Sequence, residues 1–220
     1  MKRLVLAVIL LFSSYGILDA DTLDSYNSVC TIHVELEKSW TGGTGFVFKE
    51  DKDFFYIMTA GHVIDGCIKN YCLLHFFNNG KAVDKVEGEI VKSDYNKSET
   101  VDEAELVRDL AILKVKKSVL EALNFTPKVI PLAPANKRIS QNEIVFSLGS
   151  PNLRWPSAFL GSVNYSLPER FFFNPDVIGG RSGSPVYDKD CTMVIGVIIW
   201  STHEGGCAIS PLGISRHNLD

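Results

Sequence analysis

Hydrophobic and polar residues alternate over short segments of this chain, which is the pattern of half-buried β-strands. In Lys85-Val86-Glu87-Gly88-Glu89-Ile90, for example, every second residue is charged. Side chains with a period of two point to opposite faces of a strand. Alternating or continuously apolar runs predict strands over 29–36, 45–48, 54–59, 71–77, 85–93, 111–115, 143–148, 158–166, 186–187, 193–200 and 208–211.

Turn residues such as Asn78-Asn79-Gly80 and Ser150-Pro151-Asn152 separate these segments. Many short strands divided by such turns are typical of an all-β sandwich or barrel. A helix is predicted over 117–123, and the proline-containing stretch 117–139 has weak strand character. We therefore expect two β halves, at about 27–116 and 140–216, joined by a linker.

The N-terminus has the features of a secretory signal. Met1-Lys2-Arg3 is basic, Leu4–Phe12 is almost entirely aliphatic, and small residues lead to Ala20. The apolar stretch is shorter than the roughly 20 residues that a membrane span needs. We expect residues 1–20 to be removed and residues 21–220 to be secreted or periplasmic; a retained anchor is the alternative.

The composition narrows the classes of partner. The net charge is −4, and acidic and basic residues are interspersed. No basic stripe indicates nucleic-acid binding, and no polybasic segment indicates binding to a lipid surface. The length suits one compact unit with a sizeable hydrophobic core.

One serine lies in a glycine-rich loop, Gly179-Gly180-Arg181-Ser182-Gly183-Ser184-Pro185. Glycine adopts backbone angles that other residues avoid, so this loop can turn sharply and leave amide groups exposed. Converging N–H groups beside a serine can stabilise the oxyanion that forms when the hydroxyl attacks a carbonyl carbon. Ser182 is therefore a candidate nucleophile, although Gly-Ser clusters are also common in turns.

Two earlier segments supply the other groups that a serine nucleophile needs. His62 follows the apolar run that ends at Thr59-Ala60-Gly61, and Asp109 opens the apolar run 110–115. Histidine can accept the hydroxyl proton near neutral pH, and a buried carboxylate can fix its tautomer. Alternatives to Asp109 are Asp102, Glu103 and Glu105, but only Asp109 adjoins an apolar strand.

Together, several motifs resemble the trypsin-like peptidase family, especially its compact bacterial and HtrA-type branch. The motifs are at 42–47, 59–63, 109–113, 146–151 and 180–185, the last followed by 194–197. They occur in the family's order and span about residues 28 to 215. The order His, Asp, Ser also matches chymotrypsin-like enzymes rather than subtilisins or α/β-hydrolases.

The resemblance implies an all-β chymotrypsin-like fold, with two six-stranded antiparallel β-barrels and the active site in the cleft between them. It implies that His62 is the general base, that Asp109 orients it and that Ser182 is the nucleophile. The amides of Gly180 and Ser182 would form the oxyanion hole. We expect no metal, no cofactor and no PDZ domain.

The chain departs from many family members beside the nucleophile. Arg181 stands where digestive and clotting relatives have an aspartate that pairs with a newly cleaved N-terminus, and no Ile-Val-Gly-Gly activation sequence is present. Activation by insertion of the N-terminus is therefore not expected. We expect Arg181 to be a solvated loop residue, and His33, His75 and His217 to have no catalytic role.

The chain has five cysteines, Cys30, Cys67, Cys72, Cys191 and Cys207. Export to an oxidising compartment favours disulfides. We favour the pairs Cys67–Cys72 and Cys191–Cys207 with Cys30 left over, although sequence alone fixes no connectivity. Zinc binding is the alternative, but the sequence has no Cys-x-x-Cys pair and no His-Glu-x-x-His motif.

Substrate specificity is less well defined by the sequence. The resemblance places the primary pocket between the residues before Ser182 and the segment Ile199-Trp200-Ser201. Counting back from Ser182 puts Asp176 at the pocket base, which would favour Arg or Lys substrates. A pocket lined by His203 would instead accept an acidic substrate side chain. The option that we favour is a small-to-medium apolar pocket. Phe171-Phe172-Phe173 is expected in the core or cleft wall, with a role in substrate binding as the alternative.

Taken together, the sequence predicts an exported serine endopeptidase that cleaves protein or peptide substrates through an acyl-enzyme. The alternative is a catalytically silent binding protein on the same fold, because a fold does not dictate function. A complete set of His62, Asp109 and Ser182 favours the enzyme, since a binding protein has no need of all three.

Overall fold

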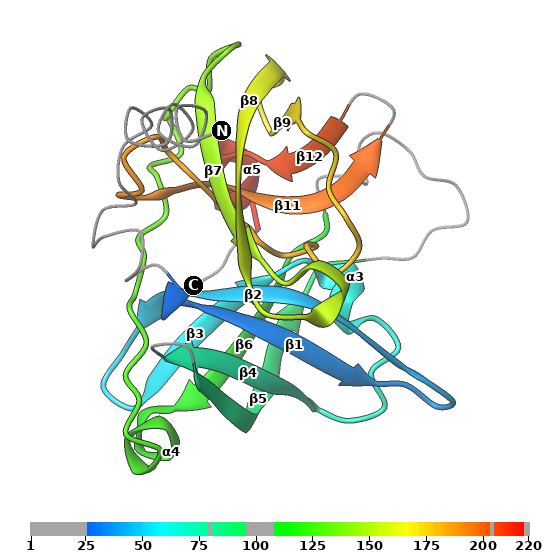
Figure 1. Ribbon diagram of the computed structural model, residues 1–220, viewed down its shortest axis with the longest axis vertical. Helices are drawn as coiled ribbons and strands as arrows, with labels where there is room; N and C mark the ends of the chain where they lie inside the picture. The colour runs from blue at the N-terminus through cyan, green and yellow to red at the C-terminus, as the bar shows by residue number, and fades with distance from the viewer. Residues whose placement is uncertain (1–25, 79–80, 96–107, 203–204, 218–220) are drawn as a thin grey trace, which may run out of the picture.

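The strands of the chain form two closed antiparallel β-barrels of six strands each, one above the other in Figure 1. The structure is a computed structural model that describes residues 26–78, 81–95, 108–202 and 205–217. The predicted all-β fold with two six-stranded barrels is confirmed. Among the described residues, no helix has the length and apolar character needed to cross a membrane.

The first barrel has the strand order β1-β2-β3-β6-β5-β4. The strands are β1 (Val29–Glu35), β2 (Trp40–Glu50), β3 (Phe54–Thr59), β4 (Tyr71–Asn78), β5 (Lys81–Ser93) and β6 (Ala111–Lys116). The short helix α3 (Gly61–Ile64) follows β3, and α4 (Lys117–Ala122) follows β6, where the sequence predicts a helix. Strand β2 is longer than predicted because its glycines hide the strand pattern, although they pair with β1.

The second barrel has the order β10-β11-β12-β9-β8-β7. Its elements are β7 (Ile144–Gly149), the 3₁₀ turn η2 (Pro151–Leu153), β8 (Ser157–Ser166), β9 (Arg170–Asn174), β10 (Pro185–Tyr187), β11 (Val194–Thr202), β12 (Gly205–Ile209) and α5 (Pro211–Ser215). Strand β9 is not among the predicted strands. Phe171, Phe172 and Phe173 are all buried in it, so the segment lacks the alternation that marks a half-exposed strand.

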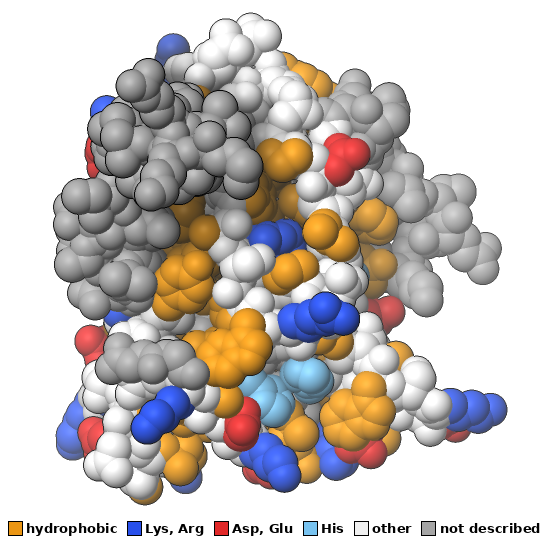
Figure 2. Space-filling view, in the orientation of Figure 1, with side chains coloured by type: hydrophobic (Ala, Val, Ile, Leu, Met, Phe, Trp, Pro, Cys, Tyr) orange, Lys and Arg blue, Asp and Glu red, His pale blue; other side chains and the backbone are white. Residues whose placement is uncertain are grey.

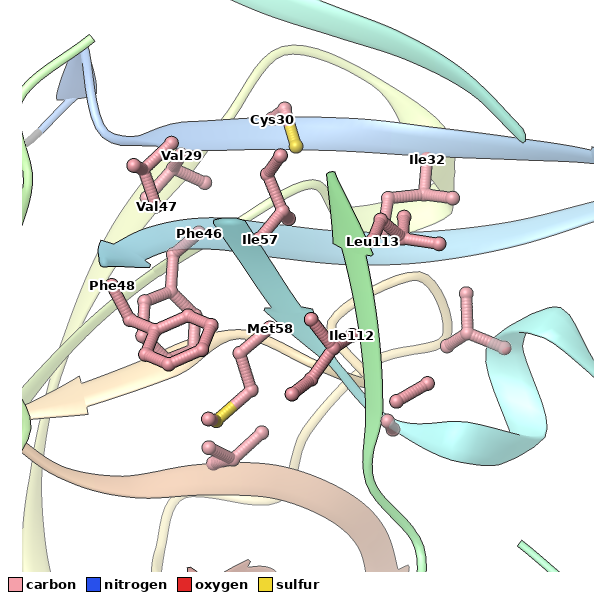
Figure 3. Packing of buried hydrophobic residues seen from close by; sticks show 14 of the residues in the cluster. Val29, Cys30, Ile32, Phe46, Val47, Phe48, Ile57, Met58, Ile112 and Leu113 are labelled. Atoms are coloured by element: carbon pink, nitrogen blue, oxygen red, sulfur yellow. The ribbon is translucent and has the colours of Figure 1, made fainter. Parts of the chain in front are cut away.

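A single hydrophobic cluster joins the first barrel to the second. Figure 3 shows Val47 and Ile57 on one side of β2 and β3, and Phe46, Phe48 and Met58 on the other. Tyr187, Val197 and Ile199 of the second barrel belong to the same cluster. Burial of this shared apolar surface holds the barrels in a fixed relation, so that residues from both can meet at one site.

The connection between the barrels is bound to both of them. Ile130 N donates to Val47 O of β2 at 3.0 Å, and Ala133 N donates to Val194 O of β11 at 2.8 Å. These backbone hydrogen bonds add to the shared core in fixing the two barrels.

Candidate active site

His62 lies in helix α3, where the chain leaves β3 and turns toward the second barrel (Figure 1). Both neighbours that face the protein interior, Gly61 and Val63, are buried, whereas the His62 side chain is 27% exposed. The local sequence therefore holds the imidazole at the surface of the first barrel while anchoring the backbone around it.

The Asp109 carboxylate binds His62 through both of its oxygens. Oδ1 accepts from the backbone N–H of His62 at 2.7 Å, and Oδ2 lies 2.7 Å from Nδ1 of the ring. Asp109 is only 1% exposed, so water does not compete for these contacts. Nδ1 donates its hydrogen to the carboxylate, which leaves the Nε2 lone pair available to accept a proton.

A second aspartate fixes the chain next to Asp109. Asp94 Oδ1 accepts from Leu110 N at 2.9 Å, and Asp94 N donates to Leu110 O at 3.1 Å. The other oxygen of Asp94 contacts the buried His217, which follows α5. The chain after α5 thus supports the segment that carries Asp109. The rival acids Asp102, Glu103 and Glu105 lie outside the described residues.

Two aromatic rings flank His62. The Trp200 ring lies 5.7 Å away between centroids, and the Tyr95 ring lies 6.1 Å away in an edge-on arrangement. Burial, followed by the negative charges of Asp109 and Asp65, raises the pKa of Tyr95, which keeps its hydroxyl protonated. The imidazole of His62 is therefore flanked by an uncharged phenol from the first barrel and an indole from β11.

Ser182 lies in a loop that packs against the segment around His62. Gly183 has φ +84°, and a Cβ there would lie 2.8 Å from Ala60 N. A Cβ on Gly43 would likewise lie 2.7 Å from Ser182 O and 2.6 Å from a Val63 methyl. Glycine is needed at these close approaches. They bring the backbone of Ser182 and Gly183 against the segment Ala60–Val63 that carries His62. The described residues show no hydrogen bond between Ser182 Oγ and His62 Nε2.

Hydrogen bonds hold the peptide groups that carry the proposed oxyanion amides. Asn152 N donates to Gly179 O at 2.7 Å, and Ser184 N donates to Arg181 O at 2.9 Å. In a trans peptide the N–H points away from the carbonyl. These bonds therefore aim the N–H groups of Gly180 and Ser182 away from the turn η2 and from Ser184. Neither N–H donates to another described residue.

Arg181 is buried, contrary to the expected solvated position. It is 5% exposed; its guanidinium lies 4.8 Å from the centroid of the Phe159 ring, and Nη2 donates to Ser157 Oγ at 2.8 Å. Nη1 has no hydrogen-bond partner among the described residues. Burial lowers the pKa of Arg181. The sharp turn at Gly180 directs the side chain onto β8 rather than into water.

The residues predicted to line the specificity pocket differ in exposure. Ile199 is buried in the core, Trp200 is half-buried next to His62, and Ser201 is exposed. Asp176 is also exposed. His203 lies outside the described residues. Phe171, Phe172 and Phe173 belong to the core, as expected.

His33 and His75 lie away from His62, in a pocket of about 190 Å³ between the first barrel and the residues after η2. Their rings are 4.6 Å apart, and Asp84 Oδ1 lies 2.9 Å from His75 Nδ1. Figure 2 shows histidine side chains in pale blue on one face of the molecule, with acidic, basic and apolar side chains around them. Burial, and then the charge of His75, lowers the pKa of His33.

The predicted disulfides are not formed: no disulfide joins any of the five cysteines, all of which are described. Burial, followed by the interaction with Cys67, raises the pKa of Cys72 to about 12. The Cys72 thiol is therefore protonated near neutral pH. The described residues contain no group of three or more His, Cys, Asp or Glu side chains placed to hold a metal ion.

Several contributors to this site were not predicted from the sequence. Thr44 lies in the motif at 42–47, and its hydroxyl donates to Gly180 O in the loop of Ser182. Nothing in the sequence indicates this contact. Asp94 and His217 are far apart in the chain, and no spacing rule connects them. Tyr95 follows a predicted strand, and its one signal in the sequence is that it is an aromatic residue close to the candidate acids.

The sequence matches the family described as trypsin-like peptidase domain over residues 43–197. The chain therefore belongs to the trypsin-like peptidases, a family of serine-type endopeptidases, and the predicted resemblance is confirmed. No curated protein matches the chain significantly.

Solved structures of serine proteases share the fold. The serine endoprotease from Yersinia pestis has a TM-score of 0.68 at 20% identity, covering 91% of this chain and 65% of its own. An M. tuberculosis protease in its active form has a TM-score of 0.67 at 21% identity, covering 90% of this chain and 82% of its own. The chain thus spans just under two thirds of the Yersinia protein.

Proposed function

We propose that this chain is an exported serine endopeptidase in which His62, Asp109 and Ser182 form the catalytic triad. The observation that carries the proposal is the buried Asp109 carboxylate, which binds both the ring and the backbone of His62. A carboxylate in this position holds the imidazole in one tautomer and stabilises the imidazolium that forms during reaction. The family membership of the chain supports the same chemistry.

In the proposed reaction, Ser182 Oγ forms a bond to the carbonyl carbon of the substrate while its proton passes to Nε2 of His62. The carbonyl electron pair moves onto oxygen, which accepts hydrogen bonds from the amides of Gly180 and Ser182. The C–N bond then breaks as His62 returns the proton to the leaving amine. Water attacks the resulting acyl-enzyme by the same route and releases the acid.

The substrates we propose are proteins or peptides, and Trp200 is the pocket residue best supported by geometry. Its ring lies 5.7 Å from that of His62, so a substrate bound at His62 would lie against the indole. Large aromatic surfaces of this kind commonly supply binding area for apolar groups.

Export rests on the sequence of residues 1–20, which lie outside the described residues. We propose that the chain after signal removal is active without further cleavage. Arg181 does not offer the carboxylate that would pair with a new N-terminus, and the loop is already held by hydrogen bonds to its backbone carbonyls. Residues 21–220 with one extra residue before Asp21 should therefore be active; activity that appears only after an internal cleavage would contradict this.

The decisive test of the proposed function is covalent labelling. A peptidyl phosphonate should react with the wild-type protein and be found on Ser182 by peptide mass spectrometry. The Ser182→Ala variant should not be labelled, because it lacks the nucleophilic oxygen. A folded wild-type protein that takes up no label and cleaves no peptide would favour the alternative, a binding protein on the same fold.

A further inference from the structure

Thr44 of β2 uses every polar atom it has in hydrogen bonds, and two of its partners lie in the loop of Ser182. Its N–H donates to Ser182 O at 2.8 Å, and its Oγ1 donates to Gly180 O at 2.8 Å. The same Oγ1 accepts from Ser150 N at 2.9 Å, and Thr44 O accepts from Thr59 Oγ1 at 2.7 Å. Thr44 is fully buried, so no water competes for these bonds.

With these contacts, every peptide group of the loop between Gly179 and Gly183 is held by a hydrogen bond to its carbonyl oxygen. The peptide groups that follow Gly179 and Arg181 are held by Asn152 and Ser184, as described above. The peptide groups that follow Gly180 and Ser182 are held by the hydroxyl and the amide of Thr44. The peptide after Gly180 lies between the two proposed oxyanion amides, so its orientation sets the angle between them.

No other side chain among the described residues donates to the backbone of residues 179–183. The Thr44 hydroxyl is therefore the side-chain link between the barrel that carries His62 and the loop that carries Ser182. Through Ser150 N it also holds the start of η2, whose Asn152 aims the Gly180 amide.

We propose that Thr44 is a positioning residue for the oxyanion hole: its hydroxyl orients the loop so that the Gly180 and Ser182 amides converge. This inference rests on the proposed function. An oxyanion hole acts on the transition state more strongly than on the bound substrate. Losing the Thr44 hydroxyl should therefore lower kcat and leave KM nearly unchanged.

The test compares Thr44→Val with Thr44→Ser and Thr31→Val. Valine keeps the size and the backbone amide but removes the hydroxyl, whereas serine keeps the hydroxyl. Thr31 is the matched control, because it pairs with Thr44 across β1 and β2 and is also buried. Its hydroxyl bonds Ser150 Oγ at 2.6 Å and, among the described residues, makes no hydrogen bond to the loop of Ser182.

We expect Thr44→Val to lower kcat about 10- to 100-fold, somewhat less than the loss of an oxyanion donor itself. Its KM should stay within about twofold, and a peptide boronate that forms a tetrahedral adduct should bind about 10- to 100-fold more weakly. Thr44→Ser and Thr31→Val should both remain within about threefold of wild type. Where Thr44→Val does not fold, Thr44→Ala is measured in its place.

A wild-type kcat in Thr44→Val, or an equal loss in Thr31→Val, would overturn the inference while leaving the proposed function in place. The inference would also be overturned if, in Thr44→Val, KM rose by the same factor as the dissociation constant of the boronate. The hydroxyl would then act equally on the bound substrate and on the tetrahedral adduct. A wild-type protein that is not labelled by phosphonate at Ser182 would overturn the proposed function and this inference together.

Discussion

The two barrels contribute to the candidate site in different ways. The first barrel presents a side chain, His62, whose position is set by the carboxylate of another side chain, Asp109. The second barrel presents a loop whose shape is set by hydrogen bonds to its backbone carbonyls and by positive φ angles at Gly180 and Gly183. The part of the site on the first barrel therefore depends on which side-chain functional groups are present. The part on the second barrel depends on which backbone angles the loop can adopt.

The largest effect is expected at Ser182, the residue of the loop that we propose as the nucleophile. Ser182→Ala should lower kcat by on the order of 10⁶-fold, because loss of a triad nucleophile removes the covalent route. The change deletes one hydroxyl, so the circular dichroism spectrum and the melting temperature should be close to wild type. Peptidase activity retained in a purified variant would refute the assignment of the nucleophile.

The next effect tests the side-chain half of the site. Asp109→Asn keeps the shape of the side chain but no longer favours the Nδ1–H tautomer of His62, and we expect kcat to fall by about 10⁴-fold. The measurement is kcat with a peptide substrate, with Asp84→Asn as a control. Asp84 contacts His75 instead and should leave kcat unchanged. A loss smaller than about tenfold in Asp109→Asn would mean that His62 is held by other contacts.

Two neighbouring glycines test the backbone half. Gly180 has φ +90°, and a Cβ there would overlap Ser150 O and lie 2.9 Å from Asn152 N, whereas a Cβ on Gly179 would meet nothing within 4 Å. Gly180→Ala should therefore misplace the proposed oxyanion amides and lower kcat by about 10²-fold or more.

Gly179→Ala is the control for this pair and should keep kcat within about threefold of wild type. Both variants are compared by kcat and by melting temperature. Equal activity of the two alanine variants would show that the backbone angles of the loop are not critical for turnover.

A smaller effect, on the free energy of unfolding, is expected at Ser157, whose hydroxyl accepts a hydrogen bond from Arg181. Ser157→Ala removes the acceptor of the Nη2 hydrogen bond from a buried cation and should lower the free energy of unfolding by about 1–2 kcal/mol. Ser166→Ala, at the far end of the same strand, alters an exposed hydroxyl and should change it by less than about 0.5 kcal/mol. Urea unfolding measures both, and equal values would argue against a stabilising role for the Ser157 contact.

The smallest effect concerns the histidine pair outside the site. Because the folded state lowers the pKa of His33, the unfolded chain binds a proton more readily as the pH falls. The folded state should therefore lose stability as the pH drops below the ordinary histidine pKa of 6.5, and this loss should level off below the folded pKa.

Urea unfolding between about pH 7.5 and about pH 5 should show a weaker pH dependence in His33→Gln than in wild type. His75, Asp84 and Arg154 lie around the same pocket and are unchanged in this variant. A pH dependence identical to that of wild type would show that His33 does not contribute to it.

Most strands followed from the sequence, because a strand with one face in water must alternate polar and apolar residues. β5 shows this pattern and was predicted, whereas β9 is buried on both faces and its three phenylalanines were not recognised as a strand. The short helices α3 and α5 were also missed, since a single turn has too few residues to establish a helical period.

The sequence by itself determined the fold class, the family and the residues that are candidates for the chemistry, because these depend on local patterns and short motifs. Only the tertiary structure decided that Asp109 bonds His62 twice, that Arg181 is buried against Phe159 and that Thr44 holds the loop of Ser182. The physical reason is that these contacts join residues distant in the chain. Their partners are chosen by how the two barrels pack, and no spacing along the sequence records that choice.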